Sequence, residues 1–76
     1  MNLVMKLIEE CAELQKALCK AERFGWDACP PKHPGRTNKA HVQDEMNDVI
    51  DAMEALIKER QAVEALAAHK EQQGVE

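Results

Sequence analysis

Aromatic residues are almost absent from this chain of 76 residues, which has one phenylalanine, one tryptophan and no tyrosine. The apolar residues, 45% of the total, are mainly Ala, Leu, Val and Met, a composition typical of helix bundles. Glycine and proline are also scarce, with three of each, and all three prolines fall within residues 25–37. The composition predicts an all-α fold of two long helices, with or without a short third, joined by one irregular loop.

Cysteine pairs, excess positive charge and long apolar runs are missing too. The three cysteines form no Cys-x-x-Cys pair, which argues against a disulfide framework and favours reduced thiols in the cytoplasm. A net charge of −4 argues against nucleic acid or an anionic membrane as a partner. The apolar stretch 1–8 ends at Glu9 and Glu10 and is too short for a signal peptide or a membrane span. We therefore expect a cytoplasmic protein.

A single domain is all that a chain of this length allows. So small a domain buries too little surface to be comfortably stable by itself. We therefore expect a homodimer or homotetramer, in which a partner subunit completes a short helical bundle.

Helical periodicity runs through residues 2–23 without a glycine or proline, and this stretch is the first predicted helix. Asn2 suits its N-cap and Gly25 its end. The loop, residues 25–37, follows.

The second predicted helix covers residues 38–60, with Thr37 or Asn38 as its N-cap. Two interpretations of the next residues remain open: the helix continues to residue 69, or it breaks near Arg60 and a short third helix follows. The polar residues 70–76 are expected to fray.

Both predicted helices carry an apolar stripe with carboxylates beside it. At about 100° per residue, Glu10 falls inside the first stripe, and Glu13 lies one turn further on, at its margin. Glu45 and Asp48 lie three residues apart along the edge of the second stripe, so they are neighbours on the helix surface. The stripes consist of Leu3, Leu7, Leu14, Ala17, Leu18 and Ala21 in the first helix and Val42, Met46, Val49, Ile50, Met53, Leu56 and Ile57 in the second.

Packing of the two stripes on each other would bring these four carboxylates together. Like charges and a partly apolar surrounding both disfavour the ionised form, and a buried unpaired charge costs on the order of several kcal/mol. A divalent cation removes the conflict, and oxygen ligands favour Mg²⁺, with Mn²⁺ as a substitute. The alternative is that the carboxylates are solvated edges of two ordinary helices.

Two motifs, Glu9-Glu10-Cys11-Ala12-Glu13-Leu14 and Glu45-Met46-Asn47-Asp48-Val49, resemble those of the MazG-type all-α nucleoside triphosphate pyrophosphohydrolases, relatives of the dimeric dUTPases. The resemblance covers about residues 3–60 and implies hydrolysis of a nucleoside triphosphate to its monophosphate and pyrophosphate. The Mg²⁺ ligands that it implies are Glu10, Glu13, Glu45 and Asp48.

Two further carboxylates have candidate roles beside these ligands. Glu9, one turn before Glu13 and outside the stripe, is the candidate base that deprotonates or orients the attacking water. Asp51, one turn beyond Asp48, is an alternative ligand or a residue that holds a ligand in place.

Basic residues gather in and just after the loop of this acidic chain. Arg36 and Lys32 are candidates for binding substrate phosphates through charge-assisted hydrogen bonds. Trp26 is a candidate for stacking on the base. Solvated cations and a tryptophan that packs on the core are the competing interpretations of the same residues.

Two other function classes stay open. In the first, the chain is a non-catalytic helical oligomerisation or interaction module, and Mg²⁺ does not change its melting temperature. In the second, its histidines and cysteines bind a transition metal as a sensor, although their spacing is poor for a Zn²⁺ site.

Overall fold

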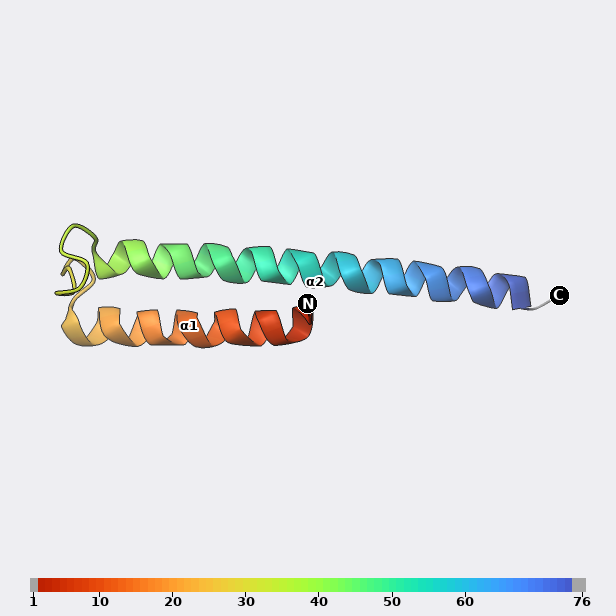
Figure 1. Cartoon of the computed structure of the whole chain (residues 1–76), viewed down its shortest axis with the longest axis horizontal. Helices are drawn as coiled ribbons and strands as arrows, with labels where there is room; N and C mark the ends of the chain where they lie inside the picture. Colours follow the sequence, from red (N-terminus) through yellow and green to blue (C-terminus); the bar gives the residue numbers. More distant parts are fainter. Residues whose placement is uncertain (1, 75–76) are drawn as a thin grey trace.

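The computed structural model describes residues 2–74, with side chains through residue 69, and this part of the chain forms two α-helices without a strand (Figure 1). Helix α1 spans Leu3–Phe24 and helix α2 spans Asn38–Gly74. They run antiparallel as a hairpin, and the second half of α2 extends beyond the start of α1 (Figure 1). The molecule therefore measures 65 × 19 × 15 Å. The all-α prediction is confirmed.

The ends of α1 are set by the two residues that the sequence indicated. The side-chain oxygen of Asn2 accepts a hydrogen bond from the Met5 N–H at 3.1 Å, as an N-cap does. Gly25 has a φ of 107°, which a residue with a β-carbon rarely adopts, and its N–H donates to the Ala21 carbonyl at 2.9 Å. The helix therefore ends there.

The start of α2 resolves the choice of N-cap. The hydroxyl of Thr37 accepts a hydrogen bond from the Ala40 N–H at 3.1 Å, so Thr37 is the cap. Asn38 is buried instead, with 4% of its surface exposed. Its side-chain nitrogen donates to the Gly25 carbonyl at 2.8 Å, and its backbone N–H donates to the Ala28 carbonyl at 2.9 Å. Asn38 thus ties the end of the loop to its beginning.

Replacing Asn38 by alanine is expected to lower the free energy of unfolding by about 1–3 kcal/mol, because the partly buried hydrogen bond to the Gly25 carbonyl is lost. Urea denaturation followed by circular dichroism measures the change. Gln43→Ala, at an exposed position of the same helix, is the control and should change stability by less than about 0.5 kcal/mol. Equal stability of the two variants would show that Asn38 does not hold the loop.

Helix α2 has no break at Arg60, and no third helix occurs in residues 2–74. It continues past residue 69, through Gly74, into a segment that was predicted to fray; residues 75–76 lie outside the described part. Neither helix, over its described length, combines the extent and the apolar character needed to cross a bilayer.

The two helices meet along a seam with alternating spacings of four and three residues, as in a two-stranded coiled coil. Its centre is built from small residues: Ala17, Ala21 and Val42 are at most 2% exposed, and Leu14 and Leu18 pack against them. The buried and half-buried seam positions are residues 3, 7, 10, 14, 17 and 21 in α1 and residues 38, 42, 45, 49, 52 and 56 in α2.

Only part of the predicted α2 stripe lies in this seam. Val42, Val49 and Leu56 do, whereas the other four side chains of the stripe are 44–51% exposed. A contact with one neighbouring helix covers a narrow arc, so the broad stripe is split between the seam and an open surface. The exposed residues are Met46, Ile50, Met53 and Ile57.

Candidate metal centre

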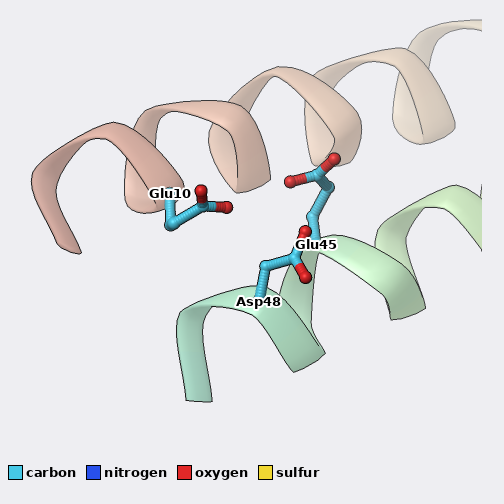
Figure 2. A group of neighbouring side chains, drawn as sticks. All are labelled: Glu10, Glu45 and Asp48. Atoms are coloured by element: carbon cyan, nitrogen blue, oxygen red, sulfur yellow. The ribbon is translucent and has the colours of Figure 1, made fainter. Parts of the chain in front are cut away.

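Two carboxylates lie inside the seam between the helices. Glu10 of α1 and Glu45 of α2 take positions that an apolar residue would fill in an ordinary coiled coil, and each side chain is 14% exposed. Asp48, on the edge of the seam, is exposed. Figure 2 shows the three side chains reaching into the space between the helices. One oxygen from each lies within 4.8 Å of the others.

The position of Glu45 differs from the one expected. The sequence pattern placed it on the edge of the α2 stripe, and the structure places it in the buried face, three residues after Val42 and four before Val49. The reason is that α1 packs against this arc of α2 and not against the arc that carries Met46 and Ile50. The arc of α2 that faces α1 is therefore the one with a carboxylate.

Burial raises the pKa of the Glu45 carboxyl above its ordinary value. His41, whose Nε2 lies 3.9 Å from Glu45 Oε1, lowers it, and the negative charges of Asp48, Glu10 and Glu13 raise it further. The site thus opposes ionisation of Glu45 unless a cation arrives.

Lys6 supplies positive charge to this group. Its Nζ lies 2.8 Å from Glu10 Oε1, and this hydrogen bond and the charge of Glu10 raise the pKa of Lys6. One ammonium beside three carboxylates leaves an excess of negative charge. Lys6 was not singled out from the sequence, although its place four residues before Glu10 was an available signal.

The donor set fits a hard divalent cation. Three carboxylates offer oxygen ligands only, two of them are largely removed from solvent, and their charge exceeds that of the neighbouring ammonium. Mg²⁺ and Mn²⁺ bind such sets and complete their coordination with water or phosphate oxygens. A depression beside the group leaves room for a ligand; its lining consists of Leu3, Lys6, Glu10, Asp48, Asp51, Ala52 and Ala55.

The other predicted carboxylates lie around this group and not in it. Glu13 is 53% exposed, and its Oε1 lies 3.7 Å from Nζ of Lys16. Glu9 is exposed as well. Asp51 lines the depression beside Asp48.

The predicted substrate residues lie at the loop end of the hairpin. Arg36 is paired with Asp44, and the indole N–H of Trp26 donates to Glu22 at 2.9 Å. Lys32 and Arg36 line a second, larger depression, but Trp26 does not. The aromatic residue there is Phe24, which is 70% exposed and was not singled out from the sequence. The lining residues are Lys20, Phe24, Ala28, Cys29, Pro30, Pro31, Lys32, His33, Arg36, Asn38 and His41.

Comparison of the chain with models of protein families, with curated proteins and with solved structures found no match. A functional assignment therefore depends on the site itself and on the motif resemblance. Among the described residues, Glu10, Glu45 and Asp48 are the carboxylates whose oxygens lie close enough together to share a cation, and the three cysteines are free thiols.

Acidification is expected to stabilise the metal-free protein through Glu45. Because its folded-state pKa is raised, the folded state binds this proton more tightly than the unfolded state. The stability that results is present below the ordinary pKa of 4.5 and is lost as the pH rises through the folded-state pKa. Urea denaturation in EDTA at about pH 7 and about pH 5 measures the effect. The lower pH should increase the free energy of unfolding more for the wild type than for Glu45→Gln. An equal gain in both would refute this role.

Proposed function

We propose that this chain is a Mg²⁺-dependent nucleoside triphosphate pyrophosphohydrolase, which converts an NTP or dNTP to its monophosphate and pyrophosphate. The observation that carries the proposal is the placement of Glu10 and Glu45 in an apolar seam beside Asp48. Carboxylates in such positions destabilise a helix pair unless a cation compensates them. The motif resemblance to the MazG-type enzymes extends the proposal from a metal site to a reaction.

Glu10, Glu45 and Asp48 would hold the ion. Glu13 would leave its ion pair with Lys16 and bind the ion as a fourth ligand. Asp51 would hold a ligand in place from the neighbouring turn. When bound, Mg²⁺ or Mn²⁺ neutralises phosphate charge and makes a coordinated water more acidic.

The chain's own residues would then position the reactants. Glu9, on the exposed side of α1 one turn before Glu13, would accept the proton of the attacking water. The water oxygen forms a bond to the α-phosphorus, the bond from that phosphorus to the bridging oxygen breaks, and pyrophosphate leaves. The choice of the α-phosphorus comes from the motif resemblance.

The nucleotide would be held by the loop end. Lys32 and Arg36 line one depression there and would bind phosphate oxygens, with Arg36 exchanging Asp44 for the substrate. Trp26 would stack on the base from beside this depression. Phe24, whose ring is exposed within it, is a second residue for the same role.

The proposal includes a cytoplasmic location and assembly into a homodimer or homotetramer. It includes no nucleic-acid or membrane partner, because the chain carries a net charge of −4.

A non-catalytic interaction module is the second candidate. The specific observation in its favour is the row of exposed Met46, Ile50, Met53 and Ile57 on α2. In this alternative the carboxylates of the seam have no ligand and serve only to limit the stability of the hairpin.

Release of pyrophosphate from a panel of ribo- and deoxyribonucleoside triphosphates, with Mg²⁺ and with EDTA, tests the hydrolase. Release that requires Mg²⁺ would support it and identify the preferred base and sugar. Absence of release from every nucleotide would reject the hydrolase and leave the interaction module.

A further inference from the structure

One broad side of the hairpin is apolar, and we name it the hairpin face. It consists of six side chains that are 44–54% exposed: Val4 and Ile8 of α1 and Met46, Ile50, Met53 and Ile57 of α2. Val4 directly follows Leu3 of the seam, and Met46 directly follows Glu45 of the seam. In an antiparallel pair, such positions of both helices flank the same side of the seam. The opposite side carries Lys6 and Asp48, which line one depression.

The exposed area of the chain exceeds that of a compact monomer. Its accessible surface is 6091 Å², whereas a globular protein of 8.6 kDa exposes about 4,700 Å². The radius of gyration is 18.9 Å, against about 11 Å for a compact domain of this length. The excess of about 1,400 Å² is larger than the roughly 800 Å² that one partner contributes to a standard interface.

The part of α2 that extends beyond the start of α1 is the second open surface. From residue 57 to residue 69 every side chain is exposed. Val63 and Leu66, 47% and 57% exposed, continue the spacing of the seam beyond the start of α1. This overhang, residues 57–74, is about 27 Å long, which matches the roughly 28 Å of α2 between residues 38 and 56.

We propose that a second copy of this chain covers both surfaces at once. A two-fold axis between Leu56 and Ile57 sets the two α2 helices antiparallel, so that the overhang of each copy lies on the hairpin face of the other. This register places Leu66 opposite Met46 and Val63 opposite Ile50, which pairs apolar residues with apolar residues. The interface is isologous and closes with two copies. Each end of the dimer is then a three-helix bundle, with the carboxylate group on its open side.

Sedimentation equilibrium tests the assembly. The wild type should have twice the chain mass at micromolar concentration, and Ile50→Lys should raise the dissociation constant at least about 100-fold, because the substitution occurs on both sides of the axis. Asn47→Lys adds the same charge at an exposed position outside the hairpin face and should leave the constant unchanged. A monomeric wild type would overturn the proposal.

Disulfide cross-linking tests the arrangement without disturbing the fold. In a background with Cys11, Cys19 and Cys29 replaced by alanine, Met46→Cys combined with Leu66→Cys should give a covalent dimer on oxidation. Each substitution alone should not, since residues 46 and 66 lie about 30 Å apart along one helix. A dimer cross-linked by Met46→Cys alone would show parallel α2 helices, and either that result or no cross-link would refute this arrangement. Neither test depends on hydrolase activity.

Discussion

Glu45→Gln is expected to lower Mg²⁺-dependent pyrophosphate release by at least about 1,000-fold in kcat/KM, which corresponds to about 4 kcal/mol. Glutamine preserves the size of the side chain and removes its charge. Glu45 belongs to the carboxylate group, with an oxygen within 4.8 Å of one from Glu10 and one from Asp48, so its substitution removes the charge of one ligand and weakens binding of a divalent cation.

The matched control is Glu54→Gln, which removes the same charge from an exposed position of α2 outside the group. It should keep wild-type activity. Isothermal titration with Mg²⁺ alone separates the steps, because Glu45→Gln should weaken binding of the ion before any nucleotide is present. Full turnover by Glu45→Gln would rule out the proposed metal ligands. Inactivity of both variants would mean that the activity depends on the net charge of the protein and not on this site.

Mg²⁺ is expected to raise the melting temperature of the wild type by about 10 °C or more at one hundred times its dissociation constant. At this ratio a ligand bound only by the folded state adds about 2.7 kcal/mol, and each kcal/mol is worth about 4–8 °C in a chain of this size. Glu45→Leu should show no such shift. In EDTA the leucine variant should instead be more stable than the wild type by about 1–3 kcal/mol, because an apolar residue fills the seam.

Differential scanning calorimetry measures both effects, at one fixed protein concentration, because the proposed dimer would make the melting temperature depend on concentration as well. Glu54→Leu, at an exposed site, controls for the removal of charge. Both the metal site and the interaction module predict that Glu45→Leu is more stable than the wild type in EDTA. The response of the wild type to Mg²⁺ distinguishes them, and no shift at millimolar Mg²⁺ would favour the module.

Local sequence determined the two helices and the loop. Asn2 caps α1 and Gly25 ends it, since both act through backbone groups within a few residues. The loop holds all three prolines, which interrupt regular helix. Convergence of Glu10, Glu45 and Asp48 was expected from packing of the two stripes, and it occurs although only part of the α2 stripe faces α1.

The tertiary contact decided the rest. Which arc of α2 faces α1 is a property of the pair, so the sequence could not show that Glu45 lies inside the seam, that Glu13 lies outside it, or that Met46 and Ile50 are exposed. The burial of Asn38 likewise depends on a carbonyl 13 residues away. Periodicity specifies a helix because its hydrogen bonds are local, whereas the environment of each carboxylate depends on the register between two helices that the chain brings together only when it folds.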